Sequence, residues 1–531
     1  MKKWLVSLLV MIFLLAPPFA HDAQAGIIGK GDATGTPGEW YIGDEPTTVK
    51  PGSLPLVFVH GLNSSSNTWI DQNDMDELTY SKNYQTAFID LYPTKNMWDN
   101  GQLLASKLAE INAYFGKKVI LVTHSKGGVD AQAAIVHANA QQYVDKVITL
   151  STPHKGSQLA DLAHSSWAGW LAAIIGNRND ATYSLQTGYM SYFRSVTDAK
   201  PNISSTPYYT FGGTSWGSFG GALYWGGLYL RQYGSNDGAV TVNSSRLPYG
   251  NEIRIGNWDH SSIRTGSATL NLFEPYLTQS IPAFAPRTSI NETAASDQAN
   301  VLIRGGEFKG TQVEKFDVEE DTKSITLDWM SQNEDSVITL QGPDQKTYAV
   351  TETSQDEAMF EGAFHHQLKV DLPKSGTWKL KVKQSKKESY VMQVAYESEL
   401  NQELQLKSSA KVVKLNIDEN NVVKDSIEGD IVIQYSKNGK TKQKKVSQEK
   451  LSAQKSFPIK NAGEGVYHIM LDVNGDTKKK ALHLSEPFFI RFTLMRMVRC
   501  ISLNQKTPFE RSKGAFMLLD SFFNLANHFC H

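Results

Sequence analysis

The sequence predicts an α/β fold, a mostly parallel sheet with helices on both faces, followed by all-β domains. Three observations support this prediction. Short apolar runs such as Leu56–Val59 and Val119–Val122 are typical of strands that are buried on both faces. Between these two runs, residues Asn100–Phe115 carry apolar side chains at helical spacing. Beyond about residue 300, the pattern changes to short alternating strands.

The remaining elements of the α/β part continue the same rhythm. Further strands are expected at Thr86–Leu91, Val144–Leu150, Tyr208–Phe211 and Glu252–Ile255, and the alanine-rich stretch Asp130–Ala140 is expected to be helical. The order strand, helix, strand, helix, strand favours a parallel sheet covered by helices.

The N-terminus has the pattern of a secretory signal peptide. Met1–Lys3 is positively charged, Trp4–Leu15 is apolar, and Ala23–Ala25 fits an A-x-A cleavage site. A membrane anchor is the alternative, but the apolar run is short and Pro17–Pro18 follows it. We therefore expect residues 1–25 to be removed and the protein to be secreted into the extracellular space.

Composition excludes some classes of function and of stabilisation. The formal net charge of −1 offers no basic excess for nucleic acid, so no nucleic-acid partner is expected. The two cysteines, Cys500 and Cys530, lie at the far end of the 531-residue chain. The exported body is therefore expected to contain no disulfide.

The stretch Lys118–Val129 joins an expected strand to an expected helix through a turn that carries Ser125. A strand, a tight turn with serine and a helix together make a nucleophile elbow. Such a turn lifts the hydroxyl above the sheet edge, and the helix N-terminus faces the place where negative charge would develop. The alternative is an ordinary strand–helix turn that contains a serine.

The sequence Thr123-x-Ser125-x-Gly127 resembles the G-x-S-x-G motif of the α/β-hydrolase superfamily, and the chain is similar to secreted bacterial lipases and esterases. Thr123 departs from the motif, which has glycine there because the strained turn needs a small residue. The resemblance implies an α/β-hydrolase fold and a serine nucleophile at Ser125.

A second motif follows the first apolar strand. His60–Ser64 has the form H-G-x-N-S and resembles the oxyanion loop of bacterial lipases. The chemistry needs two backbone N–H donors aimed at the tetrahedral oxyanion. The resemblance implies that these are the amides of Leu62 and Lys126. The alternative is a routine turn at the end of a strand.

The other two catalytic groups follow in hydrolase order. Asp237 and His260 come after Ser125, and the superfamily has serine, acid and histidine in this order. His260 would take the serine proton, and Asp237 would orient the imidazole. Asp259 competes as the acid, although neighbouring residues rarely point at each other. His124 competes as the base and is expected to face away from the elbow tip.

Two apolar segments lie where related lipases build lids and pockets. Leu159–Phe193 is expected to be a helical insertion that lids the active site or is simply an extra packed helix, with His154 and His164 beside it. Phe211–Tyr233 is rich in glycine and aromatic residues. It would shape an acyl or polymer pocket, or form a loop packed on its own aromatic side chains.

No cofactor and no metal are expected. Many related lipases hold calcium with an acidic residue two positions after the catalytic histidine, and this position is Ser262 here.

The predicted domains after the signal peptide are a catalytic domain at residues 26–280 and a linker at 281–297. A jelly-roll-like β-sandwich is expected at 298–396 and a second β-sandwich at 397–485. Residues 486–531 form an atypical apolar and basic tail that does not continue the alternating β pattern, and no function is assigned to it.

The predicted function is a secreted serine hydrolase that cleaves carboxylic esters, foremost a lipase acting on acylglycerols through an acyl-enzyme. The alternatives are a short-chain esterase, an extracellular polyester (polyhydroxyalkanoate) depolymerase, and a non-catalytic surface-binding protein. An ester or lipid substrate and a monomeric state are expected. The β domains would contact a lipid–water interface or the cell wall, although the Lys-rich stretch 437–455 also fits a solvated hairpin.

Overall fold

The computed structural model describes residues 35–164, 179–278, 300–320, 322–356 and 359–398, and, between 404 and 498, residue 423 and the strands. The expected signal peptide, the expected linker, the segment Trp167–Ile175 and both cysteines lie outside these residues. Within the described part of the chain, no helix combines the length and apolar character needed to cross a bilayer.

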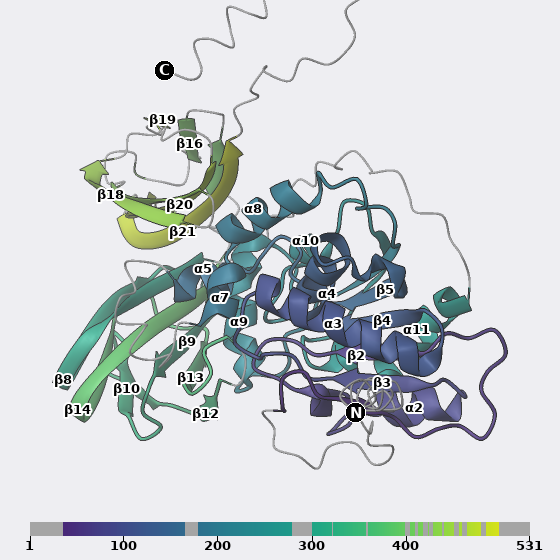
Figure 1. Cartoon of the computed structure of the whole chain (residues 1–531). Helices are drawn as coiled ribbons and strands as arrows, with labels where there is room; N and C mark the ends of the chain where they lie inside the picture. The colour runs from purple at the N-terminus through teal and green to yellow at the C-terminus, as the bar shows by residue number, and fades with distance from the viewer. Residues whose placement is uncertain are drawn as a thin grey trace, which may run out of the picture.

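The α/β domain, residues 35–278, is built on a seven-stranded sheet with the order β1-β3-β2-β4-β5-β6-β7 (Figure 1). β1 pairs antiparallel with β3, and the other strands pair in parallel. The mostly parallel sheet predicted from the sequence is therefore confirmed. The strands are β1 (Trp40–Ile42), β2 (Leu56–Val59), β3 (Thr86–Ile89), β4 (Val119–His124), β5 (Val144–Leu150), β6 (Tyr208–Gly213) and β7 (Asn251–Gly256).

Helices cover both faces of this sheet, which explains why the central strands carry apolar runs such as Leu56–Val59 and Val119–Val122. Val57 belongs to the same buried core as Leu108 of α3, whereas the next residue, Phe58, packs in a separate core with Phe273 of α11. Successive side chains of a strand point to opposite faces, so each face needs its own apolar cover. The covering helices are α3 (Met97–Phe115) and α4 (Lys126–His137) on one side, and α2 (Met75–Ser81) and α11 (Gly266–Thr278) on the other.

The expected insertion after β5 is helical where the structure describes it. For the segment Phe211–Tyr233, the sequence left two alternatives, a substrate pocket or a loop packed on its own aromatic side chains. This segment contains the helix α9, which places Trp225 in a buried core. The helices here are α5 (Gln158–Ala163), α7 (Asp180–Ser184), α8 (Thr187–Thr197), α9 (Ala222–Leu230) and α10 (Val242–Ser245). Short 3-10 helices are η1 (Ser66–Trp69), η2 (Ala140–Gln142), η4 (Arg231–Tyr233) and η5 (Ser262–Arg264).

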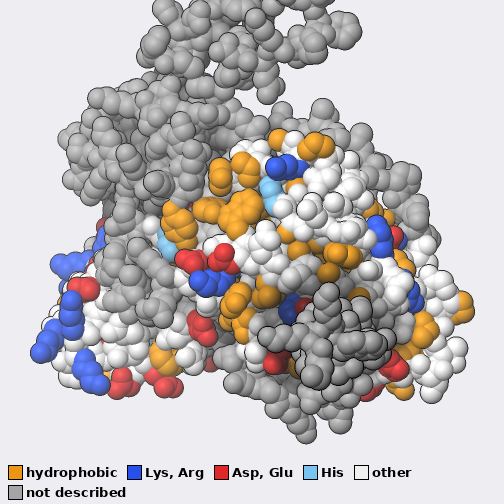
Figure 2. Space-filling model, in the orientation of Figure 1, with side chains coloured by type: hydrophobic (Ala, Val, Ile, Leu, Met, Phe, Trp, Pro, Cys, Tyr) orange, Lys and Arg blue, Asp and Glu red, His pale blue; other side chains and the backbone are white. Residues whose placement is uncertain are grey.

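Strands β8–β14 form an antiparallel domain, as the alternating pattern predicts. The long strand β14 pairs with β8 along most of its length, with β10 in its first half and with β9 in its second half. Trp329 and Trp378 are fully buried in its core. The strands are β8 (Asn300–Val318), β9 (Ser324–Ser331), β10 (Val337–Gln341), β11 (Thr347–Ala349), β12 (Glu352–Gln355), β13 (Phe364–Asp371) and β14 (Gly376–Glu397). Figure 2 shows charged side chains of both signs on its outer face.

Further strands form a three-stranded and a four-stranded sheet, and one of them corrects the sequence prediction. Strand β21 pairs antiparallel with β20 from Ser485 to Val498, so the residues directly after 485 continue the β structure and are not an atypical tail. The backbone ladder to β20 sets this pairing, and side-chain alternation does not reveal it. The strands are β15 (Leu404–Ser408), β16 (Val412–Ile417), β17 (Glu428–Lys437), β18 (Lys440–Lys450), β19 (Ser456–Pro458), β20 (Gly465–Lys478) and β21 (Ser485–Val498).

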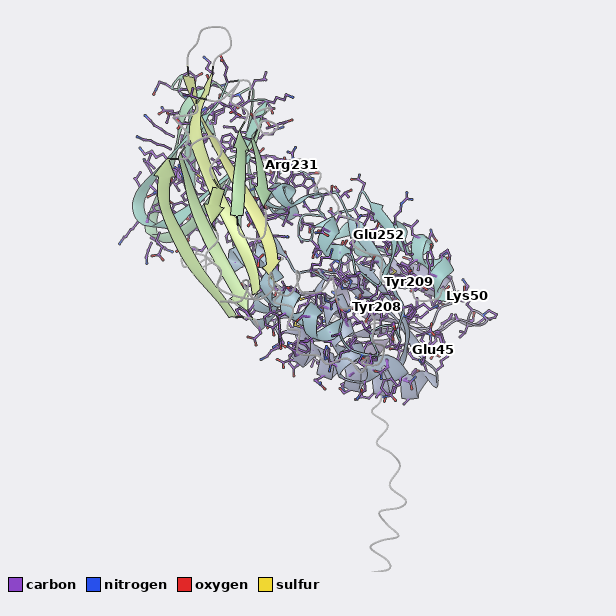
Figure 3. The ribbon with its side chains drawn as sticks, turned by 90° about the horizontal axis from the view of Figure 1, so that it is seen from above. Glu45, Lys50, Tyr208, Tyr209, Arg231 and Glu252 are labelled. Atoms are coloured by element: carbon purple, nitrogen blue, oxygen red, sulfur yellow. The ribbon has the colours of Figure 1, made fainter. Side chains whose placement is uncertain are left out.

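The α/β domain and the β8–β14 domain share one apolar core. Trp225 of α9 packs in a single buried cluster with Met330, Phe360 and Val391 of the β domain. Arg231 lies on the side of the α/β domain that faces the β strands, whereas Glu252 lies farther from them (Figure 3). The β8–β14 domain is therefore docked on the α/β domain through α9.

Candidate active site

Ser125 occupies the turn between β4 and α4 in a conformation that few residues adopt. Its φ is 52° and its ψ is −130°, and its amide donates to the carbonyl of Leu150 at 2.9 Å. A non-glycine residue at positive φ costs free energy and persists only where its surroundings hold it. The strained geometry at the strand-to-helix turn is that of a nucleophile elbow.

The residues around Ser125 show why the motif has its small positions. A Cβ added to Gly127 would lie 2.3 Å from the carbonyl oxygen of His60, so any side chain there would displace the neighbouring loop. Thr123, which departs from the motif, is fully buried, and its hydroxyl donates to the carbonyl of Ile148 at 3.1 Å. The threonine therefore fits because β5 provides a hydrogen-bond acceptor for its hydroxyl.

The structure brings Ser125, His260 and Asp237 into one hydrogen-bonded chain. The Nε2 atom of His260 lies 3.0 Å from Ser125 Oγ, and its Nδ1 atom lies 2.8 Å from Asp237 Oδ2. Asp237 is fully buried, and its other oxygen accepts from the amides of Ala239 and Val240. The carboxylate is thus fixed in place and has one oxygen left for the imidazole.

The competing residues take other roles. Asp259 accepts from the amides of Ser261 and Ser262 at 3.0 and 2.7 Å, which closes a local turn. His124, expected to face away from the elbow tip, instead lies against His260. Its Nε2–H donates to the carbonyl of His260 at 2.8 Å, and the two ring centroids are 4.7 Å apart. The expectation was wrong because the loop that carries His260 folds back over the end of β4, where His124 lies.

His124 therefore supports the backbone that carries His260, and sequence reasoning missed this role. Burial lowers the pKa of His124 well below its ordinary value, so the ring stays neutral beside His260. His164 lies elsewhere, with Nε2 at 2.9 Å from Thr182 Oγ1. His154 is fully buried and is not part of the cavity wall at Ser125.

The two predicted oxyanion donors belong to the segments next to Ser125. Lys126 is the first residue of α4, where the backbone N–H has no acceptor inside the helix. Leu62 lies in the loop after β2, and a Cβ on its neighbour Gly61 would come within 2.8 Å of Ser125 Cβ. Among the hydrogen bonds of the described residues, none uses the amide of Leu62 or Lys126 as donor.

Ser125 opens into a cavity of about 300 Å³. Its wall contains Ser125, His124 and His260, the oxyanion loop at 61–64, and the apolar side chains of Leu223, Ala239 and Met359. Met359 belongs to the β8–β14 domain, so this domain closes part of the cavity. Ser125 is only 8% exposed as a result of the combined packing.

The side chains around the site bear on metal binding. Among the described residues, no cluster of three or more His, Cys, Asp and Glu side chains is arranged to hold a metal ion. Ser262, at the position where related lipases carry an acidic calcium ligand, accepts with its hydroxyl from the amide of Asp259 at 3.0 Å.

Comparison with known proteins places this geometry in a family. Residues 51–167, which include the oxyanion loop and the elbow, match the PGAP1-like alpha/beta domain. The crystal structure of Bacillus licheniformis lipase BlEst2 in propeptide form is 41% identical, covers 87% of this chain and 98% of its own, and has a TM-score of 0.73. The chain belongs to the α/β-hydrolase family of lipases and esterases.

Membership in this family makes the protein a carboxylic ester hydrolase by class. The same Bacillus licheniformis lipase in mature form is 56% identical over 46% of this chain and all of its own, with a TM-score of 0.45. Triacylglycerol lipase 2 of Saccharomyces cerevisiae is 34% identical over 136 residues. That match spans 24% of this hydrolase and 40% of the yeast protein, so this hydrolase covers less than half of the yeast lipase.

Proposed function

We propose that the protein is a secreted serine hydrolase that cleaves carboxylic esters, foremost acylglycerols, with Ser125 as nucleophile, His260 as base and Asp237 as the orienting acid. The observation that carries the proposal is the chain of two hydrogen bonds, 3.0 and 2.8 Å long, that links these side chains, with Ser125 and His260 in the wall of one cavity. The signal-peptide pattern at residues 1–25 supports export.

The geometry supports an acyl-enzyme mechanism. His260 accepts the proton of Ser125 at Nε2 while Oγ attacks the ester carbonyl, and Asp237 stabilises the resulting imidazolium. The tetrahedral oxyanion accepts hydrogen bonds from the amides of Leu62 and Lys126. His260 then protonates the departing alcohol. Water, activated by the same imidazole, hydrolyses the acyl-Ser125 ester and releases the acid.

The cavity wall supports an acyl substrate. Leu62, Leu223 and Ala239 give it apolar surface beside Ser125. Its volume of about 300 Å³ lies at the lower end of the roughly 300–1,000 Å³ range of ligand sites. We therefore propose that longer acyl chains enter once Met359 has moved out of the wall. Short-chain esters would be accepted in the closed form as well.

The β8–β14 domain is proposed to act as a propeptide that restricts access to Ser125. Two observations favour this role. Met359 reaches the cavity wall from the β domain, and the Bacillus licheniformis lipase that matches 87% of this chain was determined in a propeptide form. Ending the chain after residue 285 would remove Met359 and should raise turnover of long-chain esters more than that of acetate.

Two assays test the proposal. Ser125→Ala should reduce hydrolysis of p-nitrophenyl acetate by the full chain to the residual rate that oxyanion binding alone supports. Equal rates for Ser125→Ala and the unmodified chain would refute a serine hydrolase. Rates on p-nitrophenyl esters of increasing acyl length, emulsified triacylglycerol and a polyhydroxyalkanoate film then separate lipase from esterase and depolymerase. Activity confined to the shortest esters, even after removal of residues beyond 285, would refute the acylglycerol preference.

A further inference from the structure

We propose that His60, Asn100, Asp130 and the Lys126 ammonium are positioning residues, which hold the two oxyanion amides at a fixed spacing. The inference rests on the proposed function, because it concerns the same oxyanion site. Leu62 and Lys126 are far apart in sequence and sit on separate elements, the loop after β2 and the start of α4. A buried chain of polar contacts connects these elements.

The first half of the chain fixes the oxyanion loop. The Nε2 atom of His60 accepts from the amide of Leu91 at 2.9 Å, and its Nδ1 lies 2.9 Å from the carbonyl of Gly61. Because the backbone N–H of Leu91 can only donate, Nε2 must accept and carries no proton. The ring proton is therefore on Nδ1, which donates to the carbonyl of Gly61. Burial also lowers the pKa of His60, which keeps the ring neutral. The imidazole therefore ties Gly61, next to Leu62, to the segment after β3.

The second half fixes the start of α4. The Lys126 ammonium contacts both oxygens of Asp130, at 2.7 and 2.8 Å, one turn along the helix. Asp130 also accepts from the amide group of Asn100 at 2.9 Å. Asn100 is hydrogen-bonded to the backbone of Tyr92 on both sides, accepting from its N–H at 3.1 Å and donating to its carbonyl at 3.0 Å.

The two halves meet at adjacent residues. His60 is bound to the amide of Leu91, and Asn100 is bound to the backbone of Tyr92, the next residue along the chain. A displacement of the segment after β3 thus moves both oxyanion donors, and a fixed segment holds both. This common anchor is the geometric basis of the proposal.

The ion pair between Lys126 and Asp130 is buried, which also supports a role in positioning. The side chains of Lys126 and Asp130 are 1% and 3% exposed. Burial lowers the pKa of Lys126 and raises that of Asp130, and their mutual contact opposes both shifts. A buried ion pair adds little stability over well-packed apolar residues of the same volume, so stability alone gives weak reason for it. A role in geometry accounts for a lysine directly after the nucleophile.

The test measures kcat and KM for p-nitrophenyl acetate and the inhibition constant of phenylboronic acid, using the full chain. The boronate forms a tetrahedral adduct on the serine and reports on the oxyanion hole. Lys126→Met keeps the backbone amide but removes the ammonium, and Asn100→Leu cuts the chain at another link. We expect kcat to fall about 10- to 100-fold, less than the roughly 10²–10³ that follows loss of a donor. KM should stay within about twofold, and boronate affinity should fall in parallel with kcat.

A matched control separates positioning from general destabilisation. Lys146 is also a buried lysine of the same domain, and its ammonium donates to the carbonyl of Tyr276 at 3.1 Å. Lys146→Met should leave kcat and boronate affinity near those of the unmodified chain at a comparable loss of melting temperature. If Lys146→Met lowers kcat as much as Lys126→Met does, the proposal is overturned.

A double variant keeps the proposal testable if Lys126→Met does not fold. Replacing the pair together, with Lys126→Met and Asp130→Leu, leaves no unpaired buried charge and should preserve the fold. A folded double variant with reduced kcat and reduced boronate affinity supports the proposal, and unmodified values for both overturn it. Absence of Ser125-dependent turnover in the unmodified chain would instead refute the proposed function itself.

Discussion

Phe360 connects the β8–β14 domain to the α/β domain, and its removal should open the active site. The side chain is fully buried, and its ring centroid lies 4.9 Å from that of Trp225 on α9. It is next to Met359, which closes the cavity wall. Phe360→Ala should therefore weaken the docking of the β domain and raise the fraction of molecules in which Ser125 is accessible.

The magnitude follows from the contacts. Truncating a fully buried phenylalanine to alanine costs about 3–5 kcal/mol, part of which falls on the β domain itself. The aromatic pair alone contributes about 0.5–1.5 kcal/mol beyond area burial. If the free energy of docking the β8–β14 domain falls by roughly 1–3 kcal/mol, the equilibrium between docked and undocked forms shifts 5- to 150-fold, since 1.4 kcal/mol is tenfold. Turnover of long-chain esters should rise by up to this factor until the open form predominates.

The assay compares hydrolysis of the long-chain ester p-nitrophenyl laurate by the full-length variant and the unmodified chain. Phe316→Ala is the matched control, because Phe316 is equally apolar and buried but packs within the core of the β8–β14 domain. Turnover should rise for Phe360→Ala and stay near the unmodified value for Phe316→Ala. Equal turnover in all three proteins, with Phe360→Ala folded, would refute the reasoning that docking restricts access.

Two further predictions concern buried acid–histidine contacts. Asp237→Asn should lower kcat by about four orders of magnitude, because the orienting acid is lost. Asp259→Asn should change kcat less than tenfold. The opposite order of kcat values would make Asp259 the acid. Burial alone would lower the pKa of His365, but the carboxylates of Asp328 and Asp356, whose oxygens lie 3.0 and 3.3 Å from the ring, outweigh it and raise the pKa to about 9. Because this value exceeds the roughly 6.5 of an unfolded histidine, the stabilisation of about 3 kcal/mol is complete below about pH 6.5 and is lost as the pH rises through about 9. The urea midpoint of the unmodified chain should fall between pH 7 and 10, and His365→Gln should lack this fall; parallel profiles would contradict the prediction.

The His365 contact could not be foreseen from the sequence. Its partners Asp328 and Asp356 lie on β9 and after β12, and the strand register of the β domain brings them together. Trp225 then stacks on the imidazole at 4.8 Å, which completes a site shared by the two domains. Alternation in the sequence predicts that strands exist, but it does not predict which strands pair.

The local features of this protein could be predicted from its sequence alone. The apolar runs of β2 and β4 predict buried strands because a strand covered on both faces has no polar side. The elbow at Ser125 is equally local, since a strand, a tight turn and a helix are consecutive in the chain. The order of the three candidate catalytic residues could also be predicted, through resemblance to a known family.

How distant segments meet follows from the packing of the whole chain and could not be predicted from the sequence. It shows Asp237 rather than Asp259 beside the imidazole, His124 against His260, and Met359 in the wall of the cavity. It also shows β21 paired with β20, where the sequence had predicted an atypical tail. Each of these contacts depends on loop paths and strand register, which arise when the whole chain packs. The spacing of residues along a single element carries no information about them.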